Sequence, residues 1–260
     1  KLIENEIVRQ NEIYNKSLLI DNRKEKKTKK QLEEEQLIKD FITATDNFVV
    51  YRPSFRLHTL LAGYPWFLDW GRDSLISFEG LLLVTKRFDI AKEVLQTLVR
   101  DIKFGLVPNG YSGFDNRPLY NSVDASLLLF EQIQKYVEYT EDYEFVKENL
   151  YEKLKDIIEN YKNGIDVDDN NIYLDTDYLI VSGTQNTQNT WMDAKCNNKA
   201  VTPRNGKAVE INSLWYNANI IMADLENKIG NKNDAKKYQE LARKCKKAFN
   251  EKFYNKKRKC

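Results

Sequence analysis

Apolar residues in this 260-residue chain recur in two helical patterns that alternate along the sequence. Residues 75–84 and 125–130 are apolar on nearly every side, as helices buried on all faces are. Other stretches repeat apolar residues on one face only, as amphipathic helices do: 88–104, 143–162, 209–228 and 238–253. One buried and one amphipathic helix about every fifty residues predicts stacked helical hairpins. Both a closed α/α toroid and a solenoid of helix pairs have this order, so the predicted class is all-α.

The composition excludes several classes of function. The 41 Lys and Arg nearly balance the 39 Asp and Glu, and a net charge of +2 predicts neither a nucleic-acid nor a membrane partner. No apolar run approaches the length of a membrane span, and the first ten residues lack the apolar core of a signal peptide, so a cytoplasmic location is expected. Three cysteines and a single histidine without metal-type spacing predict no metal site.

Two polar segments interrupt the helical pattern. Residues 21–35 form a charge block without an apolar face, which predicts a solvated helix or linker, so we divide the chain into residues 1–35 and 36–260. Residues 163–207 are rich in Asn, Thr and Asp and are far longer than a typical connection between helices. Such a segment usually has a function or is disordered, and its internal "TWMDA" argues against plain disorder.

Polar and aromatic residues gather in four clusters, at residues 66–74, 108–126, 189–195 and 201–218. Three of them directly precede a helix, so in a toroid they would meet at one rim. Each cluster also has a purely structural interpretation: Asp73, Asn121 or Asp124 as helix N-caps, and Tyr120 and Trp215 as core. Taken together, however, the clusters favour the wall of a binding pocket.

The residue types in these clusters suit a carbohydrate. Aromatic rings stack on the apolar faces of sugars, while Asp, Asn and Arg hydrogen-bond hydroxyl groups, and hydrolysis of a glycosidic bond needs two carboxyl groups. A single histidine leaves little scope for a Ser-His-Asp triad, and "GRDS" lacks the glycines of a phosphate-binding loop. Acid–base chemistry by carboxylates is the reaction class that remains.

Four motifs of the sequence resemble those of one family in both order and spacing. They are "GYPWFLDWGRDSLISFEGLLLVTKRFDIAKEVL", "GLVPNGYSGFDNRPLYNSVDASLLLF", "TWMDAK" and "VTPRNGKAVEINSLWYNA", which together cover roughly residues 60–220. The sequence resembles the C-terminal amylo-α-1,6-glucosidase domain of glycogen debranching enzymes. The resemblance implies an (α/α)6 toroid that removes the α-1,6-linked glucose at a glycogen branch point with inversion and without a cofactor. The expected partner is therefore glycogen or a branched α-glucan.

The resemblance also implies roles for individual residues. Asp193 in "TWMDA" matches the family's general acid, and Arg72 with Asp73 resembles a clamp on a terminal glucose. Further matching or neighbouring positions are expected around the pocket: Trp66, Asp69, Trp70, Tyr120, Asn121, Asp124, Trp191, Lys207, Glu210, Trp215, Tyr216 and Asn217.

The sequence also departs from the family pattern. About seven or eight of the twelve helices are expected, and no segment resembles the motif of the catalytic base, a glutamate; Glu210 matches another position. The toroid is thus predicted to be incomplete, the base to lie beyond this chain, and residues 1–35 to be a connector from an absent N-terminal domain. Two other interpretations remain: a non-catalytic sugar-binding relic of the same fold, and an α/α scaffold for protein binding.

Overall fold

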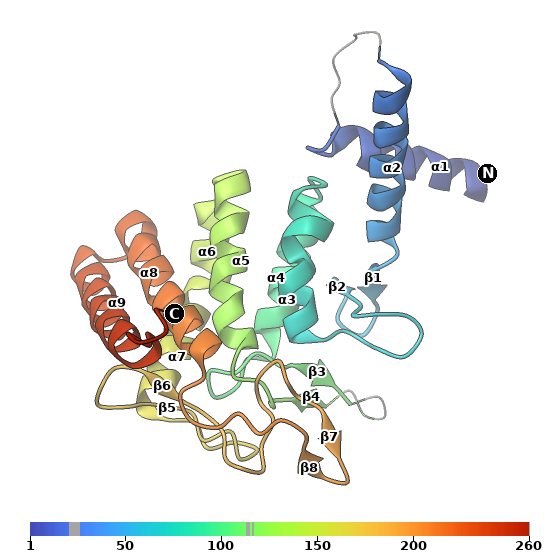
Figure 1. The fold of residues 1–260 in the computed structure, drawn as a ribbon. Helices are drawn as coiled ribbons and strands as arrows, with labels where there is room; N and C mark the ends of the chain where they lie inside the picture. The colour runs from blue at the N-terminus through green and yellow to red at the C-terminus, as the bar shows by residue number, and fades with distance from the viewer. Residues whose placement is uncertain (21–26, 113–114, 116, 260) are drawn as a thin grey trace. The chain divides into compact units, whose positions relative to one another are not determined.

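A computed structural model describes residues 1–20, 27–112, 115 and 117–259, and in this part of the chain helices dominate. It contains nine α-helices, one π-helical turn (η1) and four two-stranded antiparallel hairpins (Figure 1). The all-α class predicted from periodicity is therefore confirmed. The chain forms two compact units, Lys1–Thr97 and Leu98–Cys260. The division predicted after residue 35 falls inside a helix.

The first unit begins with two long helices and a hairpin. Its elements are α1 (Leu2–Lys16), α2 (Lys29–Asp46), β1 (Val49–Arg52), β2 (Leu57–Leu60), α3 (Gly71–Phe78), η1 (Glu79–Leu83) and most of α4 (Phe88–Arg100). Helix α2 starts at a capping box, in which the Thr28 side chain accepts from the Gln31 N–H and the Gln31 side chain accepts from the Thr28 N–H. Residues 21–26 of the predicted charge block lie outside the described residues, and the rest of the block leads into α2.

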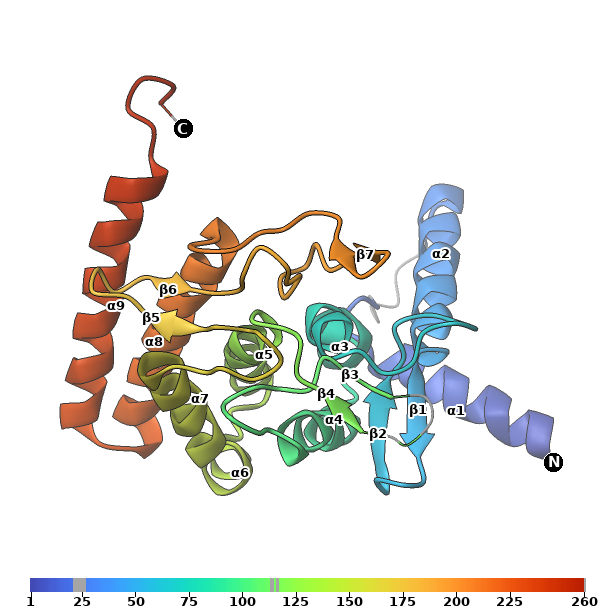
Figure 2. The same cartoon turned by 90° about the horizontal axis from the view of Figure 1, so that it is seen from below.

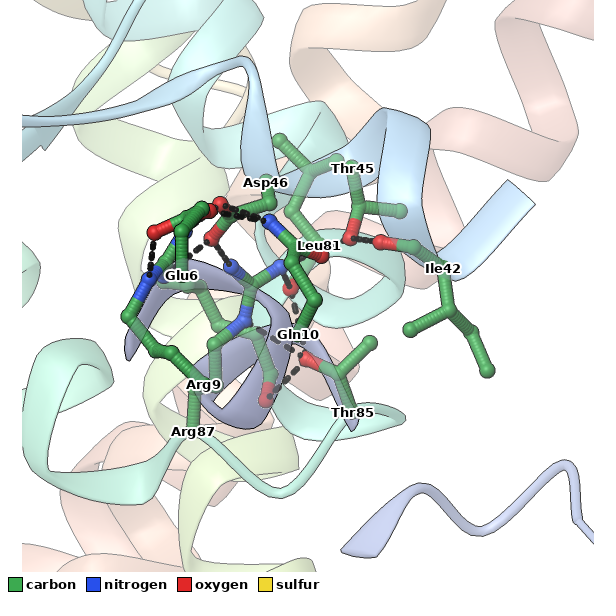
Figure 3. Close-up of polar contacts among 10 residues, drawn as sticks. Glu6, Arg9, Gln10, Ile42, Thr45, Asp46, Leu81, Thr85 and Arg87 are labelled. Atoms are coloured by element: carbon green, nitrogen blue, oxygen red, sulfur yellow. Dashed lines mark hydrogen bonds and ion pairs between the residues drawn. The ribbon is translucent and has the colours of Figure 1, made fainter. Parts of the chain in front are cut away.

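A polar network centred on Asp46 and Arg87 joins α1, α2 and the segment around η1 (Figure 3). Asp46, at the end of α2, accepts from Arg87 at 2.9 Å and from Arg9 and Gln10 of α1. The Arg87 side chain is only 6% exposed and also donates to Thr45, Thr85 and the Leu81 carbonyl. A buried guanidinium is tolerated because each of its three nitrogens has an acceptor.

The second unit is built around α8 (Val209–Ile229). Helices α5 (Ala125–Thr140), α6 (Tyr143–Asn149) and α7 (Tyr151–Asn163) contact α8, and α9 (Lys232–Phe253) packs along it (Figures 1 and 2). The stacked rings of Tyr161 and Trp215, with centroids 6.1 Å apart, lie in the core of this unit. At one end of these helices lie β3 (Gly110–Tyr111), β4 (Pro118–Leu119), β5 (Tyr173–Leu174), β6 (Ile180–Val181), β7 (Lys195–Cys196), β8 (Lys199–Ala200) and their loops (Figure 1).

The predicted helices form, with differences at a few positions. Residues 143–162 make two helices, because α6 ends before Leu150 and α7 begins at Tyr151. Residues 2–16, which fall within the predicted connector, form α1. In the described part of residues 36–260 the helices are most of α2 and α3 to α9, in agreement with the seven or eight expected there. In residues 75–84, Leu75, Phe78, Leu82 and Leu83 are buried as expected, but Ile76 is 65% exposed. None of the described helices has the length and apolar character that a bilayer crossing requires.

Candidate functional site

In the first unit, the 66–74 cluster leads directly into α3. Trp70 occupies the N-cap position without a side-chain hydrogen bond, and Asp73 lies in the first helical turn, where a carboxylate is favoured by the helix dipole. The N-cap interpretation of Asp73 is therefore wrong by three residues. Arg72 is buried, whereas Asp73 is exposed.

Asp69 ties this loop to the β1–β2 hairpin. Its carboxylate forms an ion pair with Arg52 of β1 and accepts from the Thr59 hydroxyl of β2 at 3.3 Å, and its side chain is 7% exposed. Trp66 is 84% exposed and Trp70 is half-buried. Asp69 thus joins this loop to the hairpin, and Trp66 is the more exposed of the two rings.

In the second unit, the 108–126 cluster positions three predicted site residues before α5. The Tyr120 hydroxyl donates to the Asp101 carbonyl at 2.7 Å, and burial, followed by the nearby Asp101 charge, raises the pKa of Tyr120. Asp124 occupies the N-cap position of α5, but its carboxylate accepts from Ser122, and the Ser122 hydroxyl accepts the Ala125 N–H at 3.2 Å. Ser122 therefore supplies the capping bond that the sequence assigned to Asp124 or Asn121.

The long polar segment 163–207 meets this cluster through buried amides. Asn170 and Asn189 are 1% and 3% exposed. The Asn189 amide donates to both the carbonyl and the side-chain oxygen of Asn170 at 3.2 Å, and Asn170 donates in turn to the Tyr120 carbonyl. The Asn189 carbonyl accepts from the Val123 N–H at 2.8 Å. These bonds fix three chain segments against one another.

A polar cavity of about 230 Å³ lies between these segments, and we call it the amide pocket. Two of its side chains, Asn170 and Asn189, are locked by the bonds just described. The Oδ1 atom of Asn121 is buried and has no hydrogen-bond partner among the residues that the structure describes. The lining consists of five carboxamides with flanking charged, hydroxyl and apolar groups: Asn121, Asn170, Asn186, Gln188, Asn189, Asp168, Asp169, Lys195, Tyr120, Thr187 and Leu119.

Asp193 and Trp191 lie on the segment that runs from the amide pocket to β7. Asn189 and Lys195, which bracket this segment, both line the pocket. Asp193 is half-buried and Trp191 is 56% exposed. Because Lys195 follows Asp193 by two residues, and an extended chain spans at most about 3.6 Å per residue, their Cα atoms are at most about 7 Å apart. The predicted acid therefore belongs to the same neighbourhood as the pocket.

Arg204 holds the start of α8 next to this segment. It forms a two-bond ion pair with Glu210, of which the Nη2–Oε2 bond is 2.7 Å, and its Nη1 lies 3.4 Å from the Thr190 hydroxyl oxygen. Burial alone would raise the pKa of Glu210, but the Arg204 hydrogen bonds outweigh it and lower that pKa. Glu210 is therefore an ionised partner of Arg204 at neutral pH.

Lys207 is held by carboxylates from the same long segment. Its ammonium lies 2.6 Å from Asp175 and 2.7 Å from Asp177, and Lys252 of α9 also reaches Asp177 at 2.5 Å. Burial opposes ionisation of Asp177, yet the hydrogen bonds from Lys207 and Lys252 lower its pKa to about 2. In this conformation the structure gives Lys207 a role in fixing the loop between β5 and β6.

The last predicted residues lie on α8. Trp215 is fully buried against Tyr161, so the structure supports the core interpretation that the sequence left open for it. Tyr216 and Asn217 are half-buried, and the Lys246 ammonium lies 6.0 Å from the centre of the Tyr216 ring.

Sequence reasoning missed most of the residues that line the pocket. Asn170, Asn186 and Gln188 belong to none of the four clusters or motifs, whereas Asn189 is the first residue of the 189–195 cluster. The signal that pointed to them was coarse: an Asn/Thr/Asp-rich segment too long for a plain connection. Arg204 lay inside a quoted motif, but only the structure pairs it with Glu210.

Comparison with known proteins agrees with this arrangement of helices and polar loops. A family model described as amylo-alpha-1,6-glucosidase matches residues 43–260, and the chain belongs to this family. A glycogen debranching enzyme of Saccharomyces cerevisiae is 28% identical over 232 residues. The match covers 68% of this chain and 15% of the yeast protein, so the chain spans well under a fifth of that relative's length.

Proposed function

We propose that the protein is a glycoside hydrolase that removes α-1,6-linked glucose at branch points of glycogen or a similar α-glucan. The observation that best supports this is the family match over residues 43–260, which includes Asp193 and the amide pocket beside it. A cytoplasmic location is part of the same proposal.

In the proposed reaction Asp193 is the general acid. Its carboxyl proton passes to the glycosidic oxygen as the bond to the anomeric carbon breaks, and water attacks that carbon from the opposite face. A second carboxylate takes the proton from the water. In an inverting enzyme the two carboxyl groups are about 6.5–9.5 Å apart, which leaves room for this water.

Within residues 1–260 we assign no general base. Glu210 is a poor candidate because both of its oxygens already accept hydrogen bonds from Arg204. We assign Glu210 and Arg204 a positioning role, since together they hold the start of α8 beside Thr190, three residues before Asp193. In this proposal the base is a glutamate outside these residues, as the family resemblance implies.

Glucose release from a branch-trimmed dextrin tests the proposal on the full-length protein. We expect β-glucose as the first product by NMR, and a loss of about 10²- to 10⁴-fold in kcat for Asp193→Asn. Asp166→Asn is the matched control, because Asp166 is an exposed aspartate of the same long segment that does not line the pocket.

Three results would count against parts of the proposal. If the wild-type protein binds the dextrin without releasing glucose, the hydrolase activity is refuted and the interpretation as a non-catalytic sugar-binding relic holds. α-Glucose as the first product refutes inversion. Equal activity of Asp193→Asn and Asp166→Asn removes Asp193 from the role of acid.

A further inference from the structure

The carboxamides and carboxylates that line the amide pocket indicate which kind of ligand it suits. Its five carboxamides each offer both a donor and an acceptor, and two carboxylates add further acceptors. A hydroxyl group also donates and accepts, so a ligand with several hydroxyl groups matches this lining. An apolar ligand would leave the amides unpaired at a cost in affinity.

The charges on the lining argue against an ionic ligand. Asp168 and Asp169 outnumber the single ammonium of Lys195, which disfavours a phosphate or a carboxylate. Among the described residues, no three His, Cys, Asp or Glu side chains gather closely enough to hold a metal ion. A neutral ligand fits both observations.

The deep side of the pocket is rigid before any ligand arrives. Asn170 and Asn189 are buried and hydrogen-bonded to each other, to Tyr120 and, through backbone groups, to Val123 and Gly183. Gly183 allows this packing, because a Cβ at that position would lie 2.9 Å from the Thr187 hydroxyl oxygen and 3.3 Å from Asn189 Oδ1. Side chains fixed in advance lose little entropy on binding.

Within the described part of the chain, one polar side-chain atom of this rigid frame lacks a hydrogen-bond partner. Asn121 Oδ1 is buried, and Asn121 lines the pocket beside Asn170 and Asn189. A buried acceptor without a donor is costly, so this amide gains where it can turn toward a ligand hydroxyl in the cavity.

We propose that the amide pocket is a hydroxyl-binding site for one sugar ring of the glucan, next to the segment that contains Asp193. The choice of a glucan rests on the proposed function; the preference for a neutral, hydroxyl-rich ligand rests on the lining alone. The volume of about 230 Å³ is below the usual range for drug-sized ligands, which suits a single ring.

Isothermal titration of the full chain with isomaltose tests this site, with glycerol and inorganic phosphate as comparison probes. We expect saturable binding of isomaltose that is weakened about 10-fold by Gln188→Leu and by Asn121→Leu, since each change removes hydrogen bonds and leaves a sugar hydroxyl unpaired. Gln185→Leu is the matched control, because Gln185 is an exposed neighbour that does not line the pocket. Circular dichroism and thermal midpoints show that each variant is folded.

The possible failures separate this site from the proposed function. Isomaltose binding that is unchanged in both lining variants, or tighter binding of phosphate than of isomaltose, overturns the site. Absence of isomaltose binding while the full-length protein still releases glucose does the same. If the pocket binds isomaltose as expected but no dextrin releases glucose, the site stands and the proposed hydrolase activity fails.

Discussion

Replacing Asp46 by Asn tests whether the polar network in Figure 3 stabilises the first unit. The substitution keeps the shape of the side chain and one acceptor oxygen, but it removes the negative charge between Arg87 and Arg9. The Arg87 side chain is 6% exposed, so its charge would then be buried without a counter-charge. Removing one partner of a buried ion pair costs about 3–5 kcal/mol.

Two features of the structure reduce that cost. Arg87 keeps hydrogen bonds to Thr45, Thr85 and the Leu81 carbonyl, and Asp46 itself is 13% exposed, so water reaches part of the pair. We therefore expect Asp46→Asn to lower the free energy of unfolding by about 2–3 kcal/mol, below the full buried-pair value. Urea unfolding followed by tryptophan fluorescence measures this, because Trp66 and Trp70 belong to the first unit.

Glu6→Gln is the matched control for the same network. Glu6 is exposed and pairs with Arg9 rather than with Arg87, so its loss is expected to cost far less stability than the loss of Asp46. The difference between the two variants should persist at high salt, which screens exposed pairs more strongly than buried ones. Equal costs for Asp46→Asn and Glu6→Gln, within about 0.5 kcal/mol, would refute the view that the buried pair holds this unit together.

Three other outcomes follow from features of the second unit. The pKa of Asp177 is lowered to about 2, so this carboxylate stabilises the fold at any pH above its pKa in the unfolded chain and loses that contribution as the pH falls toward 2. Asp177→Asn should therefore flatten the acid end of a plot of urea midpoint against pH, and an unchanged plot contradicts this. Gly230→Ala should cost about 2 kcal/mol or more in thermal or urea unfolding, because the new Cβ would overlap Glu226 and the Tyr151 hydroxyl, whereas a neutral result would mean that both side chains move aside easily. Burial raises the pKa of the Cys245 thiol to about 12, so a thiol reagent should label exposed Cys196 quickly in native protein and Cys245 only on unfolding, as mass spectrometry of the two peptides would show.

The helices could be predicted because burial on one face or on all faces is a local property of the sequence. The helix predicted over residues 209–228 is α8, which ends one residue later, at Ile229. Periodicity could not predict the break at Leu150, because apolar residues continue through it, nor α1, which is largely exposed along its length. The boundary between compact units depends on packing between distant residues and left no mark in composition.

The candidate site was predictable only in part, for a different reason. Motif residues such as Asp193 were found by resemblance, whereas the hydrogen-bonding of Asn170 and Asn189 spans nineteen residues and follows no spacing rule. A motif match can also suggest too much: Trp215 lies inside a matched motif and was expected at the pocket, but it is buried in the core. Residue type indicates what a side chain can do; the fold decides what it contacts.

The backbone bridge between Ser182 and Gly206 has a consequence for how this protein can vary. The two residues exchange hydrogen bonds at 3.0 and 2.8 Å, which closes the intervening chain at its base, and Asn212 of α8 pairs with both backbone groups of Ile180 nearby. A loop closed in this way can change length at its tip with little cost, since doubling a flexible loop costs only about 0.6 kcal/mol. The exposed Asn197–Asn198 turn between β7 and β8 is such a tip. Relatives and engineered variants should accept insertions there, while the amide-bearing stretch nearer the bridge should keep its length.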